Sequence, residues 1–176
     1  MSSSVPMFFG LLAALLVQTA SCGNLRLHSA PHPSFVASHS HRGNPNVRNT
    51  TLQTCSKPGT ALTGFTRTGH CVDTGNDDLG SHHICIEMKS DFCKVTGQGN
   101  PGWCASEMPC MDDESKDCKI GNWCVCQWAF AKYIKLAGGC DSIVNVVCDA
   151  TNMAAYRAYE DGSEEKECLK KRCNLS

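Results

Sequence analysis

The sequence predicts a small α+β domain, a two-layer sandwich of short strands and two or three helices that disulfides reinforce. Its 176 residues include 14 cysteines, about 8% of the chain, close to the fraction at which a short secreted chain is typical of a disulfide scaffold. Short strand-like and helix-like segments follow one another without a long β-α-β repeat, which favours α+β over a parallel sheet. A domain of this size buries roughly two-thirds of its unfolded surface, so we expect crosslinks to reinforce a core rather than replace it.

The charge balance limits the classes of partner. The formal net charge is -1 and the isoelectric point is near 6.6, whereas nucleic-acid binding requires a clustered basic excess. Outside the amino terminus, no apolar run reaches the ~20 residues of a membrane-spanning helix. We therefore expect no nucleic-acid partner and no membrane association after signal cleavage.

The amino terminus predicts secretion. Val5 to Ala20 is a short apolar segment followed by small residues, which is typical of a signal peptide over residues 1–22. The alternative is a buried amino-terminal helix. Cleavage beside Cys22 leaves 14 or 13 cysteines, and the sequence does not decide between the two counts. An oxidising destination favours disulfides over the metal sites that so many thiols indicate in a reducing cytosol.

Residues 23–54 differ in composition from the rest of the chain. They contain three arginines and four histidines but no acidic residue, and we interpret them as a disordered leader. An acidic-poor, Arg- and Ser-containing segment also suits a transit peptide, so import into a plastid through a two-part leader is the alternative to secretion. Asn49 begins an Asn-Thr-Thr sequon and is the candidate glycosylation site.

Three segments are strand candidates within an expected folded domain of residues 55–160. They are Leu62 to Thr66, then Ile84 to Met88, where apolar residues alternate with Cys85 and Glu87, and Ile143 to Cys148, which has the highest β-branched content. The segment Gly121 to Trp128 contains a further strand-like Cys-Val-Cys, and we expect it to meet the segment Leu62 to Met88 in space.

Helices are expected in three places. Ser90 is a possible cap for a helix through Val95, with Gly97 as its stop. The segment that begins at Trp128 predicts a helix that Gly138 and Gly139 end. Thr151 or Asn152 is expected to cap a third helix. Residues 99–119 lack periodicity, so disulfides are the expected means of ordering them. Residues 161–176 are read as a charged tail whose two cysteines are tied back to the body.

Several of these stretches resemble a known family. LTGFTRTGHC, TGNDDLGSHHIC, GQGN, GNWCVCQW and VVCDATNMAAY occur in the family's order between Cys55 and Tyr159. The set is similar to the family known as domain of unknown function 2237. The resemblance implies a compact two-layer α+β sandwich, in agreement with the residue patterns, but it brings no established activity.

The resemblance also separates the cysteines into two sets. The family pattern implies functional or structural importance for Cys55, Arg67, Cys71, Asp78, Gly80, His82, Cys85, Trp123, Cys124 and Cys126. Eight other cysteines are additions in this chain: Cys93, Cys104, Cys110, Cys118, Cys140, Cys148, Cys168 and Cys173. Asn152 stands where relatives usually have a histidine, which removes a possible base or metal ligand.

The residues that match the family pattern have two chemical interpretations, which are metal binding and thiol chemistry. Soft ligands suitable for tetrahedral zinc are offered by Cys71, His82 (or His83), Cys85, Cys124 and Cys126, although no Cys-x-x-Cys pair is present. Cys71 follows a histidine, and Cys126 precedes a helix, so either could be a nucleophile with a lowered pKa. The simpler interpretation is that all of these cysteines are structural cystines.

Ligand binding is the third interpretation. Asp78 and His82 could exchange protons or hold a ligand, although aspartates in Gly-rich turns more often fix their own loop. The simplest interpretation of Trp123 and Trp128 is that they are core aromatics, although they could also line a pocket. The candidate ligand-binding residues are Arg67, Asp78, His82, Trp123 and Trp128, and the candidate catalytic residues are His82, Cys71 and Cys126.

Two functional hypotheses follow. The first is a secreted, non-enzymatic domain that binds a small molecule or a protein partner and needs no cofactor. Its surface would centre on residues 67–85 and on Trp123 to Trp128. The second is a thiol- or zinc-dependent enzyme that uses the Cys/His cluster.

Overall fold

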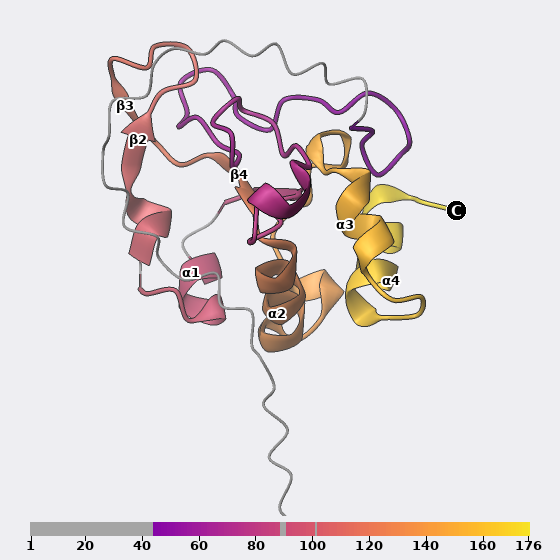
Figure 1. The fold of residues 1–176 in the computed structure, drawn as a ribbon. Coiled ribbons are helices and arrows are strands. Elements are labelled where there is room, and N and C mark those ends of the chain that lie inside the picture. Colours follow the sequence, from indigo (N-terminus) through magenta and orange to yellow (C-terminus); the bar gives the residue numbers. More distant parts are fainter. Residues whose placement is uncertain (1–43, 89–90, 101) are drawn as a thin grey trace, which may run out of the picture.

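The computed structural model of the protein describes residues 44–88, 91–100 and 102–176. The expected signal peptide of residues 1–22 and most of the expected leader lie outside the described residues. The described part is an α+β fold with two small antiparallel sheets and four α-helices (Figure 1). The predicted fold class is therefore confirmed.

The central sheet joins two segments that are distant in the sequence. Strand β1 (Ile84–Glu87) pairs antiparallel with β4 (Asn122–Val125). The second sheet is a hairpin of β2 (Glu107–Pro109) and β3 (Asp117–Lys119). The pairing of β1 with β4 confirms that the two cysteine-containing segments meet.

The two faces of the central sheet are covered by different material. Ile84 lies opposite Val125 and Ile86 opposite Trp123, and all four side chains belong to the main hydrophobic core. The alternate residues project to the other face because side chains alternate along a strand. The sheet is therefore buried on both sides, although its alternating pattern predicted one buried face.

Two of the predicted strands, residues 62–66 and 143–148, do not form strands in the structure. Residues 143–148 make one bridge to β1, Ile86 with Val146, and then enter the 3-10 helix η5 (Cys148–Ala150). The helix η4 (Cys140–Ser142) lies directly before them, so little extended backbone remains. Residues 62–66 form no strand either, because Gly64 at φ 89° and Arg67 at φ 53° turn the backbone.

The helices confirm the predicted ends before Gly97 and Gly138 and the predicted cap at Asn152, whereas Ser90, the expected cap of the first helix, lies outside the described residues. They are α1 (Asp91–Thr96), α2 (Gln127–Ala137), α3 (Met153–Ala158) and α4 (Glu164–Cys173). Gly138 ends α2 at φ 92°, where its N–H donates to the Ile134 carbonyl, a left-handed conformation that glycine adopts without strain. Asn152 caps α3 by accepting a hydrogen bond from the Ala154 N–H. None of the helices in the described part is long and apolar enough to span a bilayer.

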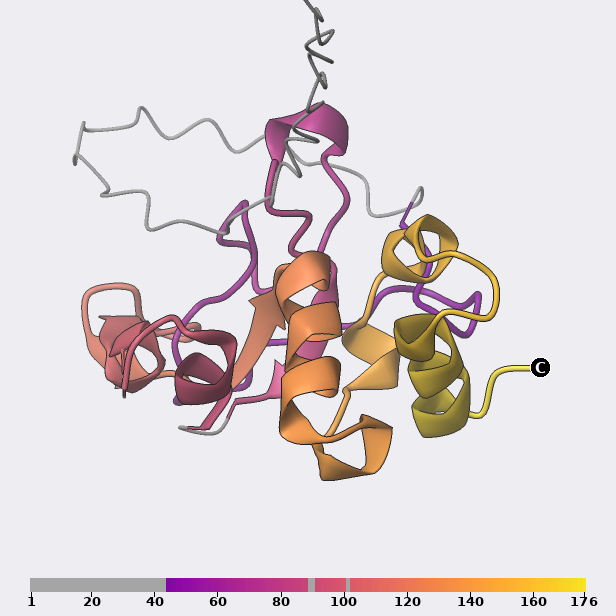
Figure 2. The ribbon, with the colours of Figure 1, turned by 90° about the horizontal axis from the view of Figure 1, so that it is seen from below.

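Helices α1 and α2 pack against each other beside the central sheet (Figures 1 and 2). The rings of Phe92 and Tyr133 meet edge to face with centroids 5.0 Å apart. Phe130 and Ile134 are buried on the same helix as Tyr133. Aromatic side chains of this size contribute most of the burial in a small core.

The folded domain begins before the expected boundary at Cys55. Val47 and Leu52 are each only 3% exposed. The Val47 N–H donates to the Thr151 carbonyl at 2.9 Å, and Asn46 forms a bridge with Asn152. Residues 44–54 are therefore part of the fold. The expected boundary was wrong because the polar composition of this stretch hides two apolar residues that become buried. Asn49, the candidate glycosylation site, lies exposed in the turn between them at φ 59°.

The expected charged tail is helix α4. Ser163 caps it, and acidic residues in its first turn and basic residues in its last turn complement the helix dipole. Cys168 and Leu169 are buried on the face toward the domain. The disulfides Cys140–Cys168 and Cys148–Cys173 attach the helix to the body, as expected.

Disulfides also order the segment between α1 and β4. Cys93 bonds to Cys104, and Cys110 bonds to Cys118 across the β2–β3 hairpin. This segment contains only short elements, which confirms the prediction that crosslinks are its means of ordering.

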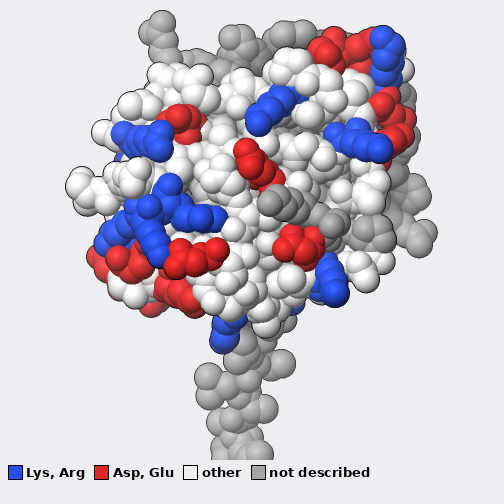
Figure 3. Space-filling view, turned by 180° about the vertical axis from the view of Figure 1, so that it is seen from behind, with Lys and Arg blue, Asp and Glu red and all other residues white. Residues whose placement is uncertain are grey.

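Charges of both signs are interspersed on the surface shown in Figure 3. Among the described ion pairs, Lys171 bonds to Asp141 at 2.6 Å and Lys170 bonds to Glu167 at 2.7 Å. Basic residues of α4 are therefore partly neutralised by acidic neighbours.

Loop length should set the order in which disulfides contribute to stability. The Cys71–Cys124 disulfide joins two residues that are 53 positions apart in the sequence, and Cys93–Cys104 joins two residues that are 11 positions apart. Loop-closure entropy gives about 4 and about 3 kcal/mol for these separations. We expect the double variant Cys71→Ala/Cys124→Ala to lose more free energy of unfolding than Cys93→Ala/Cys104→Ala in guanidinium titrations. Equal losses, or a larger loss for the 93–104 pair, would contradict this order.

Candidate functional site

The candidate site forms where β1 meets β4. Cys85 lies directly opposite Cys124 in the register. Just outside the sheet, the Gln127 N–H donates to the Ser81 carbonyl at 3.0 Å. The loop before β1 and the first turn of α2 are therefore joined at one end of the sheet, and Figure 2 shows the loop with the 3-10 helix η2 (Gly75–Asp77) extending beyond that end of α2.

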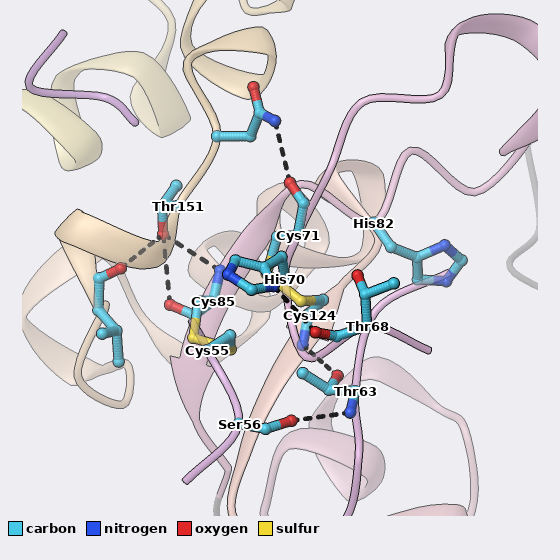
Figure 4. The surroundings of a disulfide bond; sticks show 12 residues. Cys55, Ser56, Thr63, Thr68, His70, Cys71, His82, Cys85, Cys124 and Thr151 are labelled. Carbon is cyan, nitrogen blue, oxygen red and sulfur yellow. Dashed lines mark hydrogen bonds between the residues drawn. A yellow bond between two sulfur atoms is a disulfide. The ribbon is translucent and has the colours of Figure 1, made fainter. Parts of the chain in front are cut away.

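A second core, made of sulfur atoms, covers the cysteine face of the sheet. Cys55 bonds to Cys85, and Cys71 bonds to Cys124. All four residues are 0–1% exposed and pack with Ala150. Figure 4 shows the four cysteines together. The Sγ atoms of Cys55, Cys71 and Cys124 lie within 4.8 Å of one another. The two disulfides are thus adjacent and share one buried compartment.

Buried hydroxyl groups satisfy the backbone around this compartment. Thr151 Oγ1 accepts from the Cys85 N–H at 3.1 Å, and Thr63 Oγ1 accepts from the Cys124 N–H at 2.9 Å. Ser56 Oγ accepts from the Thr63 N–H at 2.9 Å. These side chains replace strand partners where the two-stranded sheet ends, since a buried N–H without a partner is costly. Figure 4 shows them surrounding the disulfides.

Asp78 and His82 form a side-chain pair at the surface of the loop. Asp78 Oδ1 lies 2.7 Å from His82 Nδ1, and Asp78 Oδ2 accepts from the His82 N–H at 2.7 Å. The Asp78 side chain is 1% exposed, whereas 34% of the His82 side chain is exposed. The carboxylate accepts the Nδ1 proton, so Nε2 of the neutral ring is an acceptor.

The loop backbone is shaped to hold this pair. A Cβ atom at Gly80 would lie 2.3 Å from His82 Cε1, so the ring occupies the space that any other residue would need. Ser81 is left-handed at φ 49°. Asp78 also accepts from the Gly80 N–H at 3.1 Å, which confirms that it fixes its own loop.

The Asp78 carboxyl is a stronger acid than usual. Its burial acts to raise the pKa, but the hydrogen bonds from the His82 side chain and backbone, together with the charge of the ring, outweigh burial and lower the pKa below 3.8. The carboxylate therefore stays ionised and keeps the His82 ring oriented.

His83 lies on the interior side of the same loop. Its Nδ1 is 3.1 Å from Gln127 Oε1, and its Nε2 is 3.7 Å from Asp73 Oδ1 with no hydrogen-bond partner among the described residues. The Tyr159 hydroxyl donates to the Gln127 carbonyl, and burial raises the Tyr159 pKa. His83 is therefore a core histidine that attaches the loop to α2.

Arg67 and Trp123 form a separate contact. The Arg67 guanidinium carbon lies 5.2 Å from the centroid of the Trp123 ring, and burial lowers the Arg67 pKa. Trp123 is 6% exposed and contacts Trp103 with ring centroids 5.9 Å apart. Trp123 is thus a core aromatic, and this cation–π contact holds the loop around Arg67 against the sheet.

The predicted metal and catalytic residues are only partly brought together. Cys71, Cys85 and Cys124 share a compartment, but the fourth residue of this group is Cys55 rather than His82 or Cys126. Figure 4 shows the His82 ring turned away from the sulfur atoms. Cys126 precedes α2 and is also disulfide-bonded. The two candidate nucleophiles, Cys71 and Cys126, therefore carry no thiol in this structure.

Sequence reasoning missed several residues that shape the site. Cys55 was absent from the expected ligand set because no spacing rule connects it to Cys85 or Cys124. Thr63, Thr151 and Gln127 gave no signal, since a hydroxyl or amide is informative only once its neighbours are known. Asn152 is structural: its Nδ2 donates to the Cys71 carbonyl at 3.0 Å and to Asn44 Oδ1 at 2.8 Å.

Comparison with known families supports one assignment. Residues 45–161, more than half of the chain, match the family described as uncharacterised proteins conserved in bacteria, domain of unknown function 2237. The chain belongs to this family. No curated protein matches the sequence. The family match begins at residue 45, so it includes the buried Val47 and Leu52 as well as both disulfides of the sulfur compartment.

Ionisation of Asp78 should contribute to the stability of this family member. The folded-state pKa lies below the ordinary value of 3.8, so the contribution is complete above about pH 5 and is lost as the pH falls through that ordinary value toward the lower folded one. We expect Asp78→Asn to lower the free energy of unfolding at pH 6 by about 1–3 kcal/mol and to flatten its dependence on pH below about pH 4. Urea titrations at pH 6 and at a series of pH values below about 4 measure this effect.

Asp113→Asn is the matched control. The Asp113 pKa is also lowered, through bonds from Lys116 and Ser115, but the pair lies at the surface and is screened by solvent. A pH dependence that Asp113→Asn removes and Asp78→Asn retains would contradict the role of Asp78.

Proposed function

We propose that this protein is a secreted, disulfide-stabilised binding domain without enzymatic activity. The observation that carries the proposal is the state of the sulfur atoms: the candidate nucleophiles are bonded, and the four cysteines of the sulfur compartment are buried. Such disulfide content is typical of oxidising compartments. The apolar segment Val5 to Ala20 is the reason to choose the secretory pathway, and a plastid reached through a two-part leader is the alternative.

The proposed binding surface lies where the Asp78 loop meets the start of α2. Leu79 is 87% exposed and Trp128 is 42% exposed, and the Gln127–Ser81 hydrogen bond joins their segments. Between them in sequence lies His82, whose exposed ring is oriented by Asp78. Exposed large apolar side chains rimmed by polar groups are typical of interaction sites.

The chemistry of the surface suggests the chemistry of its ligand. Trp128 contacts Tyr159 edge to face at 6.3 Å, so its ring is held in place while part of it faces solvent. His82 Nε2 accepts a hydrogen bond when the ring is neutral. We infer a small molecule or protein segment that places an apolar group on Trp128 and a donor on His82, with Asp78 acting as a positioning residue.

Arg67 and Trp123, the other candidate ligand-binding residues, have a different role in this proposal. They contact each other at the other end of the loop, and Trp123 is buried. They support the position of residues 62–71 instead of contacting the ligand.

The competing function is a thiol- or zinc-dependent enzyme. The Asp78–His82 pair favours it, because a carboxylate that orients a partly exposed imidazole is also the arrangement of a general base. Such an enzyme needs a thiol or a metal ligand that is free in the working state.

Disulfide mapping separates the two functions. We expect non-reducing digestion of the natively produced protein and mass spectrometry to recover the linked peptides Cys55–Cys85 and Cys71–Cys124 quantitatively. Recovery of Cys71, Cys85, Cys124 and Cys126 as alkylated thiols would overturn the binding-domain proposal and favour the enzyme.

Ligand binding should depend on Trp128. We expect a fragment screen by two-dimensional amide NMR to yield ligands that shift the signals of Ser81, His82 and Gln127. Trp128→Ala should weaken their binding about tenfold or more, which corresponds to about 1.4 kcal/mol. Leu136→Ala is the matched control, since Leu136 is a 54% exposed apolar residue of the same helix, and it should leave affinity unchanged. Equal losses in the two variants, or shifts confined to other regions, would refute the proposed surface.

A further inference from the structure

We propose that Cys55, Cys71, Cys85 and Cys124 form a closed zinc site when their two disulfides are reduced. The Sγ atoms of Cys55, Cys71 and Cys124 lie within 4.8 Å of one another, and Cys85 Sγ is bonded directly to that of Cys55. Three of the four sulfur atoms are therefore already gathered in one place, and the fourth is attached to one of them. This inference concerns the core and does not depend on the proposed binding surface.

The geometry is close to that of a tetrathiolate site. Structural zinc is bound tetrahedrally with Zn–S distances of about 2.3 Å, which places sulfur atoms roughly 3.8 Å apart. Among Cys55, Cys71 and Cys124, no pair of sulfur atoms needs to approach by more than about 1 Å from the 4.8 Å limit. Cys85 Sγ starts from its bond to Cys55 Sγ. The bonded ones need to separate, which rotation about Cα–Cβ bonds achieves.

The backbone of each cysteine is held by a contact that does not involve sulfur. The Cys55 N–H donates to the Gly69 carbonyl at 2.7 Å. The N–H groups of Cys85 and Cys124 donate to threonine hydroxyls, and the Cys71 carbonyl accepts from Asn152 Nδ2. Cys85 and Cys124 are also fixed by the register of β1 and β4. Reduction of the disulfides therefore leaves the four side chains directed into the same compartment.

The chemistry of the change is balanced by a dithiol reductant and by zinc. Each disulfide accepts two electrons and two protons from a dithiol, which becomes a disulfide itself. Zinc then displaces the four thiol protons and is held by four thiolates with a net charge of -2. Because all four positions are protein ligands, the site is structural and leaves no coordination position for a substrate.

The eight additional cysteines provide an internal contrast. They pair only among themselves, as Cys93–Cys104, Cys110–Cys118, Cys140–Cys168 and Cys148–Cys173. One of these pairs lies near a carboxylate, in the group Cys110, Asp112 and Cys118, but Asp112 is exposed. The four-sulfur group is buried, and it is the site that we assign to zinc. The same compartment is thus closed by two disulfides in oxidising conditions and by one metal ion in reducing conditions.

The test uses the full chain and zinc alone. The protein is reduced, unfolded and refolded without oxygen in the presence of Zn²⁺, and bound metal is counted by elemental mass spectrometry after gel filtration. We expect one zinc per chain. Alkylation followed by peptide mapping should show Cys55, Cys71, Cys85 and Cys124 protected until a chelator is added, while the other cysteines react. Cobalt in place of zinc should give the absorption bands of tetrahedral thiolate coordination.

Matched variants locate the metal. Cys71→Ser and Cys124→Ser should lose it, whereas Cys93→Ser and Cys110→Ser should retain it. Absence of retained zinc, loss of zinc in Cys110→Ser but not in Cys71→Ser, or protection spread over all cysteines would overturn the proposal. The protection pattern of the unsubstituted chain decides the question even where a variant fails to fold.

Discussion

The pairing of β1 with β4 is the interaction on which the rest of the structure depends. It places Cys85 opposite Cys124 without joining them to each other. Each bonds instead to the segment before β1, at Cys55 and Cys71. Because neighbouring residues on paired strands project to the same face, both disulfides fasten residues 55–71 onto one side of the sheet. The opposite side, with Ile84 and Ile86, is left for the aromatic core of α1 and α2.

The disulfides divide into a central group and a peripheral group. The central pair lies within the region that matches the family, is fully buried and closes long loops. The peripheral disulfides attach segments that have little secondary structure, such as the β2–β3 hairpin and α4. A short chain segment cannot offset its conformational entropy with a few backbone hydrogen bonds, and a crosslink reduces that entropy in the unfolded state. The additional cysteines therefore extend the stabilised region without changing the sulfur compartment.

The polar residues of the site have two different structural roles. Thr63, Thr151 and Asn152 satisfy buried backbone groups around the sulfur atoms, which a two-stranded sheet cannot do by itself. Asp78 holds His82 in place at the surface, where Gly80 leaves room for the ring. The first group makes the interior rigid, and the second presents an imidazole nitrogen to solvent in the loop that the Gln127–Ser81 hydrogen bond joins to α2. Rigid support beneath an exposed polar and aromatic surface is the arrangement that favours specific binding.

The sequence by itself determined the fold class, the family, the disulfide-rich character and the boundaries of α2. These features follow from local composition, helix caps and ordered motifs, which are properties of nearby residues. Only the tertiary structure decided that Cys55, not His82 or Cys126, completes the sulfur group, that residues 143–148 form no strand, and that Val47 and α4 belong to the core. Those outcomes depend on contacts between residues that lie far apart in the chain, such as Val47 with Thr151 and Cys140 with Cys168, and no local pattern encodes which distant partner a residue finds.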